Sequence, residues 1–287
     1  MGRFQKLLAW ILLPALLLGF LLRDNLAIQR ETVPLTFLRL PASFDGFRVA
    51  EIADLHGRVF GKDSRQLLRQ VRKARPDLIA IDGDLFDENT DLSMLPPLLT
   101  GLTAIAPTFY VTGNHEWQLA ELPELLSSME ALGVRVLRND YTVLTRGPDR
   151  LVVAGVHDPC GYRDQKSPEA LMEDIRQKEG DDAFVLMLAH RNDALSMWSA
   201  LGADLVLAGH AHGGVVRLPF IGGVFGNGRK LFPDFDAGPY FEKGTCLYVS
   251  RGLGPAGFRL FNRPHLPILE LKAGNREHFV NYSPECL

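Results

Sequence analysis

The sequence predicts an α/β fold, in which helices flank a buried β-sheet. From about Phe44 onward, short apolar runs alternate with amphipathic stretches, which is the pattern of consecutive βα units. Polar residues cluster where the apolar runs end, and neither an internal repeat nor a long Gly/Ser linker interrupts the pattern. Of the 287 residues, 46% are apolar and 23% are charged, so the chain can build a core and is not disordered.

The composition also argues against two classes of protein. With 31 Lys and Arg against 34 Asp and Glu, the formal net charge is -3, so no nucleic-acid-binding surface is expected. Cys160, Cys246 and Cys286 lack CxxC spacing. Neither a disulfide framework nor a thiolate zinc site is therefore predicted.

The N-terminal segment Leu7–Leu22 is apolar and lies between Lys6 and Arg23. We interpret it as an uncleaved, single-pass membrane anchor comprising residues 1–23. A helix of about 16 residues extends about 24 Å, less than the roughly 30 Å hydrocarbon core, so the flanking cations are expected to snorkel. A cleaved signal peptide and a buried soluble helix are the alternatives. The positions of the basic residues do not indicate which side of the membrane the protein faces.

A connector with a first strand, residues 24–45, precedes one main domain, residues 46–287. The clearest helix is Ser64–Ala74, which has one apolar and one basic face and is stopped by Pro76. The predicted strands are Phe47–Ala53, Leu78–Ile81, Thr108–Val111, Val134–Leu137, Leu151–Val156, Phe184–Leu188, Leu205–Ala208, Cys246–Val249 and Ile268–Leu271.

Five short motifs place polar side chains at the ends of predicted strands. In a parallel sheet the carboxyl ends of the strands form the ligand crevice. Asp54, Asp84 and Asn114 follow one another at intervals of about 30 residues, the size of one βαβ unit, so crossovers bring them together. The residues are Asp54 and His56 in ADLHG, Asp84 and Asp87 in GDLFD, Asn114 and His115 in GNHE, His190 in LAH, and His210 and His212 in GHAHGG.

These residue types indicate a transition-metal site. Asp, Asn and His without Cys offer mixed oxygen and imidazole ligands, which suit Mn, Fe, Zn or Ni better than Mg or Ca. Each motif alone is weak, because a single His is more often structural and a GD or GN pair is more often a turn. Five of the 8 histidines lie in this ordered set, however, and the set favours a metal site.

The ordered motifs resemble those of the calcineurin-like metallophosphoesterases, DxH, GDxxD, GNHE/D, a lone His and GHxH, from about Asp54 to His212. The surrounding FDGFRVAEIADLHG, AGHAHGGVVRLPFIG and YVSRGLG are similar to the membrane-associated branch with YkuE-type phosphoesterases and UDP-diacylglucosamine hydrolases. The resemblance implies a two-sheet β-sandwich flanked by helices. One local departure is Arg191-Asn-Asp after His190, where we expect a proline.

The resemblance also implies two divalent transition metal ions, with Mn favoured. One ion would be held by Asp54, His56, Asp84 and His212, and the other by Asp84, Asn114, His190 and His210. Asp84 would bridge them through its two oxygens, and a hydroxide shared by the metals would be the nucleophile. His115 would stabilise the transition state or protonate the leaving oxygen. Asp87 would orient His115, with a helix N-cap as the alternative role.

Other patterns resemble motifs but lack required parts. Gly252–Gly257 matches GxGxxG, yet prolines rather than a helical pattern follow it, and Gly223–Lys230 lacks the ending of a P-loop. His157 and Asp158 could line the pocket, although an ordinary loop is favoured. The aromatic segment Leu218–Phe241 could contact a bilayer surface or an acyl chain, and a loop that packs its own aromatics is the simpler interpretation.

The sequence thus predicts a membrane-anchored, binuclear metal-dependent phosphoesterase that cleaves a phosphodiester or pyrophosphate bond, with residues 46–287 as the catalytic domain. A lipid-linked or cell-envelope substrate fits the anchor. One alternative is an enzyme for soluble phosphoesters whose anchor only localises it. Another is a noncatalytic metal-binding scaffold, which would need the ligands but not His115; the presence of His115 and Asp87 favours the enzyme.

Overall fold

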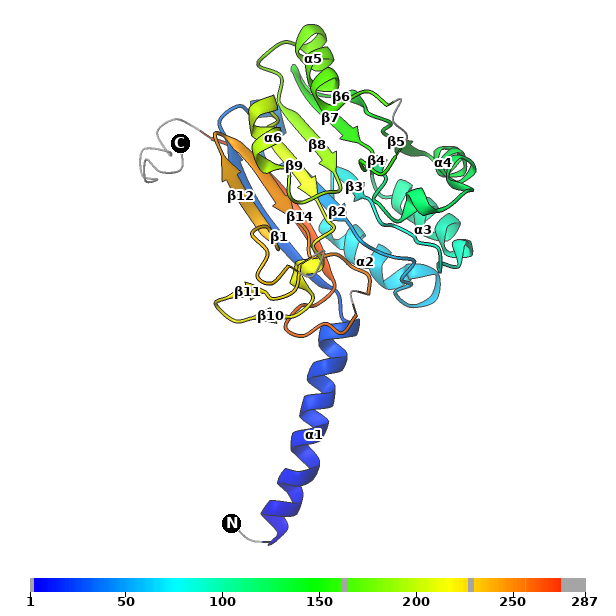
Figure 1. The fold of residues 1–287 in the computed structure, drawn as a ribbon, viewed down its shortest axis with the longest axis vertical. Helices are drawn as coiled ribbons and strands as arrows, with labels where there is room; N and C mark the ends of the chain where they lie inside the picture. Colours follow the sequence, from blue (N-terminus) through cyan, green and yellow to red (C-terminus); the bar gives the residue numbers. More distant parts are fainter. Residues whose placement is uncertain (1–2, 162–164, 227–229, 256, 275–287) are drawn as a thin grey trace.

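Two six-stranded sheets lie face to face at the centre of the fold, with helices on the outer face of each (Figure 1). The computed structural model describes residues 3–161, 165–226, 230–255 and 257–274; in the first helix it describes the side chains of residues 10 and 12–26. The four layers form the flanked two-sheet sandwich that the sequence predicts.

The first sheet has the strand order β1-β14-β2-β3-β4-β5, and only the β14–β2 pair is antiparallel among its described strands. Its strands are β1 (Gln29–Phe37), β2 (Arg48–Ile52), β3 (Leu78–Asp82), β4 (Thr108–Val111), β5 (Val134–Val136) and β14 (His265–Ala273). Parallel β2, β3 and β4 are paired in a register that aligns Ile52 with Ile81 and Asp82 with Val111. Their carboxyl ends therefore lie at one edge of the sheet.

The second sheet has the order β12-β13-β9-β8-β7-β6, with antiparallel pairs at its two edges. Its strands are β6 (Asp140–Arg146), β7 (Asp149–Val156), β8 (Val185–Ala189), β9 (Leu205–Ala208), β12 (Gly238–Glu242) and β13 (Thr245–Val249). A small antiparallel pair, β10 (Arg217–Leu218) and β11 (Gly222–Gly223), lies between β9 and β12 in the chain.

The helices connect the strands and cover both sheets. The α-helices are α1 (Arg3–Leu26), α2 (Arg65–Ala74), α3 (Leu95–Thr103), α4 (Leu122–Ala131), α5 (Pro168–Glu179) and α6 (Leu195–Leu201). Short 3-10 helices are η1 (Ala42–Phe44), η2 (Lys62–Ser64), η3 (Leu92–Met94), η4 (Glu116–Gln118) and η5 (His212–Gly214). α2 coincides with the helix predicted at Ser64–Ala74.

All nine predicted strands overlap observed strands. Eight of them lie inside their sheets, where burial on both faces favours apolar residues throughout, and β5 is an edge strand. The sequence analysis did not predict β6 and β12, which are the two edge strands of the second sheet. Such strands bury one face only, so their sequences mix apolar and polar residues, as in DYTVLTR. β1, also an edge strand, falls in the segment for which the sequence predicts a connector and first strand.

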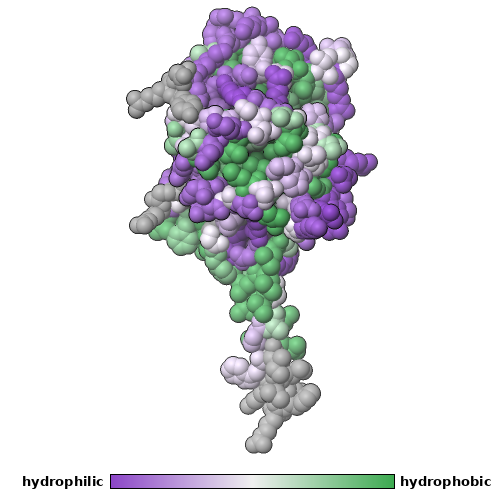
Figure 2. Space-filling view, turned by 90° about the vertical axis from the view of Figure 1, so that its right-hand side faces the viewer, coloured by the Kyte–Doolittle hydropathy of each residue, from purple (hydrophilic) through white to green (hydrophobic). Residues whose placement is uncertain are grey.

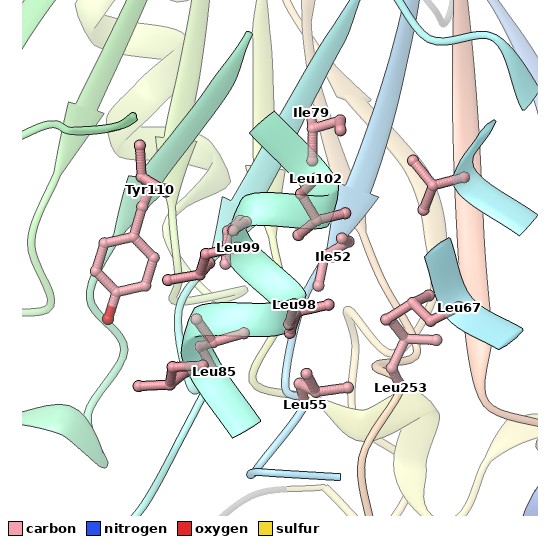
Figure 3. Packing of buried hydrophobic residues seen from close by; sticks show 14 of the residues in the cluster. Ile52, Leu55, Leu67, Ile79, Leu85, Leu98, Leu99, Leu102, Tyr110 and Leu253 are labelled. Atoms are coloured by element: carbon pink, nitrogen blue, oxygen red, sulfur yellow. The ribbon is translucent and has the colours of Figure 1, made fainter. Parts of the chain in front are cut away.

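The apolar side chains form three packed layers. Between the two sheets lies one cluster that includes Val49, Phe109 and Leu186. A second lies between the first sheet and helices α2–α4, where Figure 3 shows Ile52 and Ile79 of the strands facing Leu67, Leu98 and Leu102 of the helices. A third lies between the second sheet and α5 and α6. These layers hold both sheets rigid beneath the loops at the strand ends.

α1 extends away from the domain as a single projecting helix (Figure 1). It contains the apolar segment Leu7–Leu22, and side chains such as Trp10, Leu13 and Leu16 are 79%, 72% and 70% exposed. The expected transmembrane helix is not supported by the described residues, among which no helix is both long and apolar enough to cross a membrane.

The end of α1 is attached to the loop that precedes β14. The Asp24 carboxylate accepts a hydrogen bond from the Phe261 amide, and Asn25 exchanges hydrogen bonds of 2.9 Å with both the amide and the carbonyl of Arg259. The Arg259 side chain is buried and donates to the carbonyls of Arg251 and Gly254. The helix is therefore joined to the domain by specific polar contacts.

We expect Leu98→Ala to lower the free energy of unfolding by about 2–5 kcal/mol, because Leu98 is completely buried between α3 and the first sheet. Leu38→Ala is the matched control: Leu38 is 46% exposed, and its truncation should cost less than about 0.5 kcal/mol. Urea unfolding monitored by circular dichroism measures both. Equal losses for the two variants would contradict the packing described here.

Candidate metal centre

The seven predicted metal ligands lie at one end of the sandwich, where both sheets present the carboxyl ends of parallel strands. In the first sheet, Asp54 and His56 follow β2, Asp84 follows β3, and Asn114 follows β4; in the second, His190 follows β8, and His210 and His212 follow β9. Neither sheet alone supplies the complete set. The site depends on how the sheets pack against each other.

Asp84 is the residue at which the contributions of the two sheets meet. Its Oδ1 accepts a 2.9 Å hydrogen bond from the amide of His115. Its Oδ2 lies 3.2 Å from His190 Nε2 and 3.8 Å from His56 Nε2. One carboxylate oxygen is thus fixed by the backbone while the other lies between imidazoles from the two predicted ligand sets, as a bridging ligand requires.

Three groups of side chains in the described residues bring their ligand atoms within 4.8 Å of one another. These groups are Asp54, His56 and His212; Asp84, His190 and His210; and His56, Asp84 and His115. The second group contains the carboxylate and imidazole members of the second predicted ligand set, and the first group contains those of the first set apart from Asp84. The third adds His115, for which the sequence predicts a catalytic rather than a ligand role.

Several buried ligand atoms have no hydrogen-bond partner in the described part of the chain. They are Asp54 Oδ2, Asn114 Oδ1 and His212 Nδ1. An unsatisfied buried polar atom costs about 1–3 kcal/mol, so such a cluster is unfavourable unless something else binds to it. Oxygen and imidazole nitrogen atoms together suit divalent transition metals. The residues therefore fit bound cations.

Second contacts orient the ligands. His190 Nδ1 lies 3.0 Å from the carbonyl of Asp82 and donates to it, which turns Nε2 toward Asp84, where a cation would replace the Nε2 proton. Asp54 Oδ1 accepts from the His210 amide at 2.9 Å, which leaves Oδ2 free. Asn262 donates to the carbonyl of His212 at 2.8 Å.

Glu116 organises the loops after β3 and β4, a role that sequence reasoning missed. Its buried carboxylate accepts hydrogen bonds from the amides of Asp84, Leu85 and Gly113, at 3.1, 2.7 and 2.8 Å. Burial, with the nearby Asp84 charge, raises the pKa of Glu116 to about 8. Its place directly after Asn114-His115 in the GNHE motif was the available signal.

The charges within the site respond to one another. Burial opposes protonation of His190, but neighbouring carboxylates, Asp84 above all, raise its pKa to about 10. Burial likewise opposes ionisation of Asp84, yet His190 and the His115 amide hold its pKa well below its usual range. Burial lowers the pKa of His210 and His212 to about 4, so both are neutral near pH 7 and have a lone pair for a cation.

The backbone at the ligands is strained. Five of the seven have positive φ, a conformation that costs a residue with a side chain roughly 1 kcal/mol or more. The values are 49° for Asp54, 46° for His56, 48° for Asp84, 65° for His210 and 48° for His212. Such strain persists only where the surrounding contacts impose it, and here it turns the side chains toward one point.

Glycines precede three ligands because the strand ends approach closely. A Cβ at Gly83 would lie 2.6 Å from His190 Nδ1, one at Gly113 would lie 2.2 Å from Asp84 Oδ1, and one at Gly209 would lie 2.8 Å from Asp54 Oδ2. Gly254, in the sequence that resembles GxGxxG, is similar: its Cβ would lie 2.3 Å from the Leu55 carbonyl. These glycines serve close backbone packing.

Asp87 and His115 do not make the contact that the sequence predicts. Asp87 Oδ2 lies 3.4 Å from His56 Nδ1, and Asp87 Oδ1 accepts from the amide of Asn89 in a turn, not from a helix N-terminus. The acidic neighbour of His115 is Glu88, whose Oε2 lies 3.6 Å from His115 Nδ1. Asp87 is therefore positioned to orient the ligand His56.

A cavity of about 320 Å³ opens beside His190, and Asp158 and Arg191 are among its lining residues. Arg191 donates two hydrogen bonds to the buried Asp158 carboxylate, at 2.6 and 3.1 Å, and its Nη1 lies 2.9 Å from His210 Nε2. His157 and Asp158 belong to a loop, as expected, but both are buried. The guanidinium thus joins the loop after β7 to the loop after β9. Its place directly after His190 was the available sequence signal.

This chain is similar to several known proteins. Residues 47–214 match the profile of the calcineurin-like phosphoesterases. The metallophosphoesterase YkuE of Bacillus subtilis is 29% identical over 250 residues, 82% of each chain, and the phosphodiesterase YaeI of Escherichia coli is 30% identical over 234 residues, 78% of this chain and 82% of YaeI. A dimetal phosphatase from Danio rerio is 15% identical, with a TM-score of 0.45 over 72% of this chain and 88% of that one.

The fold and the site define a metal-dependent hydrolase of phosphoesters. Because the family profile spans more than half of the sequence, this chain belongs to the calcineurin-like phosphoesterase family, whose members bind two divalent metal ions.

We expect Gly113→Ala to weaken metal binding about 10- to 100-fold, since the added Cβ displaces the Asp84 carboxylate from its position. Gly19→Ala is the control, because a Cβ there meets nothing within 4 Å. Elemental analysis after equilibration with Mn²⁺ measures binding, and circular dichroism checks folding. A folded Gly113→Ala protein with full metal content would show that Asp84 does not need this geometry.

Proposed function

We propose that this protein is a binuclear metal-dependent phosphoesterase that hydrolyses a phosphodiester or pyrophosphate bond in a lipid-linked or cell-envelope substrate. The observation that carries the proposal is the position of Asp84 Oδ2 between His190 and His56, from the two sheets. Family membership and similarity to a phosphodiesterase support the reaction class. The projecting apolar helix supports a substrate at a membrane.

Two cations would be held by the ligand sets that share Asp84, with Asn114 as the amide member of the second. When bound, they supply Lewis acidity and lower the pKa of water toward 7. Mixed oxygen and imidazole ligands favour Mn, Fe, Zn or Ni, and we propose Mn. The chain's own part is to hold the carboxylate oxygens and imidazoles in place, which the backbone amides of His115 and His210 do for Asp84 and Asp54.

We propose that His115 gives a proton to the leaving oxygen. Its side chain is 34% exposed, whereas that of Asp84 is 2% exposed, so His115 is accessible to a substrate at the edge of the site. Its ring lies edge-on to His56, with centroids 4.9 Å apart, and Glu88 lies on its Nδ1 side. An imidazole at the accessible edge of the site is within reach of a leaving oxygen, as a general acid requires.

α1 is proposed to anchor the protein in a membrane as a single-pass helix. Eight of its described apolar side chains are nearly half exposed or more, and the helix projects away from the domain rather than packing on it. Exposed apolar surface of this extent is unfavourable in water and indicates an apolar environment. If α1 only localises the enzyme, soluble phosphoesters become the alternative substrates; a noncatalytic scaffold is less favoured because it would not need His115.

We expect Asp84→Asn to lose far more metal than Asp54→Asn or His190→Ala, since only Asp84 belongs to both ligand sets. Asp82→Asn is the matched control: Asp82 is equally buried but belongs to none of the three ligand groups. Elemental analysis gives metal per chain, and hydrolysis of bis(nitrophenyl) phosphate gives turnover. Two metals per chain and full turnover in Asp84→Asn would refute the binuclear assignment.

We expect His115→Ala to keep its metals but to lose activity, by about 10²–10⁴-fold on substrates with poor leaving groups. The loss should be smaller for nitrophenyl esters, whose leaving oxygen needs little protonation. Steady-state kinetics on alkyl and nitrophenyl phosphodiesters separate the two cases. An equal loss for both esters would remove the general-acid role and leave charge stabilisation.

We expect deletion of residues 1–22 to leave turnover of a small soluble phosphodiester intact. The deletion stops there because Asp24 and Asn25 hydrogen-bond the loop at Arg259–Phe261. Activity on a substrate embedded in vesicles should fall, because the truncated enzyme loses the high effective concentration that a shared membrane provides. Unchanged activity on vesicles would favour a soluble substrate.

A further inference from the structure

Two loops beside α1 expose large apolar side chains on the surface of the domain. We call this group the aromatic rim; it consists of Phe220, Ile221, Phe225, Phe232, Phe258 and Phe261, whose exposed fractions are 107%, 63%, 46%, 54%, 56% and 49%. Single exposed apolar residues are ordinary, but a group of six on neighbouring loops marks an interaction surface.

Contacts between the loops make the rim continuous with α1. The Arg217 amide donates to the Leu260 carbonyl at 2.9 Å, which joins the segment around β10 to the loop of Phe258 and Phe261. The ring centroids of Phe261 and of Phe20 in α1 are 5.1 Å apart. In Figure 1, β10, β11 and this loop lie where α1 leaves the domain, and Figure 2 shows apolar surface at that end of the helix.

The backbone holds several of these rings in the exposed position. Phe220, Phe232 and Phe261 have φ values of 67°, 52° and 53°. A bulky residue rarely adopts this conformation, because it strains the backbone. The sequence favours a loop that packs its own aromatics; among the residues described in 218–241, Phe235 and Tyr240 pack in this way, with ring centroids 5.0 Å apart.

Positive charge accompanies the rim, although the chain as a whole is slightly acidic. Arg23 is exposed in the last turn of α1, Arg263 donates to the carbonyls of Ala27 and Ile28 just beyond it, and Arg58 donates to the Asn25 carbonyl. Within the described residues, none of the three guanidinium groups forms an ion pair with a carboxylate. Arg23 is exposed, whereas Arg58 and Arg263 already donate to backbone carbonyls, so the three residues contribute positive charge to this surface.

We propose that the aromatic rim docks on an anionic lipid bilayer, with its rings at the level of the acyl chains and the arginines at the headgroups. Aromatic rings next to unpaired arginines are the composition expected of a membrane-interface surface. Continuity with the exposed apolar side chains of α1 favours a bilayer over a second copy of this chain, because one membrane would cover both surfaces.

The rim is coupled to the metal centre, and this inference deepens the proposed function. The Phe225 amide donates to the Gly214 carbonyl at 3.0 Å, two residues after the ligand His212. Asn262, which follows Phe261, donates to the carbonyls of His212 and Val215 at 2.8 and 3.0 Å. A docked rim would therefore hold the site close to the headgroup region, where the phosphoester of a lipid-linked substrate lies.

The test uses the full chain with Trp10→Phe, into which a reporter tryptophan is introduced by Phe220→Trp or Phe232→Trp. Phe241→Trp is the matched control: Phe241 is 56% exposed but lies on β12 opposite Cys246, toward the end of the second sheet away from the metal centre. Each protein is reconstituted in phosphatidylcholine–phosphatidylglycerol vesicles, with and without bromine on the acyl chains.

The proposal expects brominated lipid to remove the emission added at positions 220 and 232, with a blue shift, and to leave the emission added at position 241 unchanged. Emission that is equally insensitive at all three positions would overturn it. A second contradicting result would be a blue shift at positions 220 and 232 without quenching by brominated lipid, in a chain that sediments as a dimer. That result would assign the rim to contact with a second copy of the chain. Tryptophan emission does not depend on turnover, so this experiment tests the docking proposal separately from the proposed hydrolysis.

Discussion

The architecture of the site depends on the Asp84 carboxylate, which stands where the two sheets meet. One of its oxygens is bound by the His115 amide, from the loop after β4, and the other faces His190, from the second sheet. The close approach leaves no space for a Cβ at Gly83 or Gly113. The glycines, the strand ends and the ligand geometry are therefore parts of one constraint.

That constraint has an energetic cost, which the rest of the domain offsets. Left-handed backbone at five ligands and several unsatisfied buried atoms are each unfavourable by roughly 1 kcal/mol or more. Three apolar layers and the Glu116 carboxylate, which gathers three amides, hold the loops despite this cost. A cation would satisfy the buried atoms, so metal binding and the stability of these loops are coupled.

The loop that precedes β14 links the metal centre to α1. The Arg259 side chain donates to backbone carbonyls of this loop, and Asn262 donates to the carbonyl of His212. The backbone amides of Arg259 and Phe261 donate to the side chains of Asn25 and Asp24. Hydrogen bonds therefore connect the end of the helix to the segment that contains His212.

The sequence by itself determined the central strands and the ligand types. Strands buried on both faces must be apolar throughout, and metal chemistry restricts the ligands to a few residue types at strand ends, so both leave a local signal. Edge strands such as β6 and β12 leave a weaker one. Only the tertiary structure decided that Asp87 contacts His56, that Glu116 supports the Asp84 loop, that Arg191 pairs with Asp158, and that Phe220 and Phe261 share one surface. The first three contacts join loops that follow neighbouring strands of one sheet, and the last joins the segment after β9 to the loop before β14. These segments are far apart in the sequence, and no local pattern in the chain encodes how closely they approach.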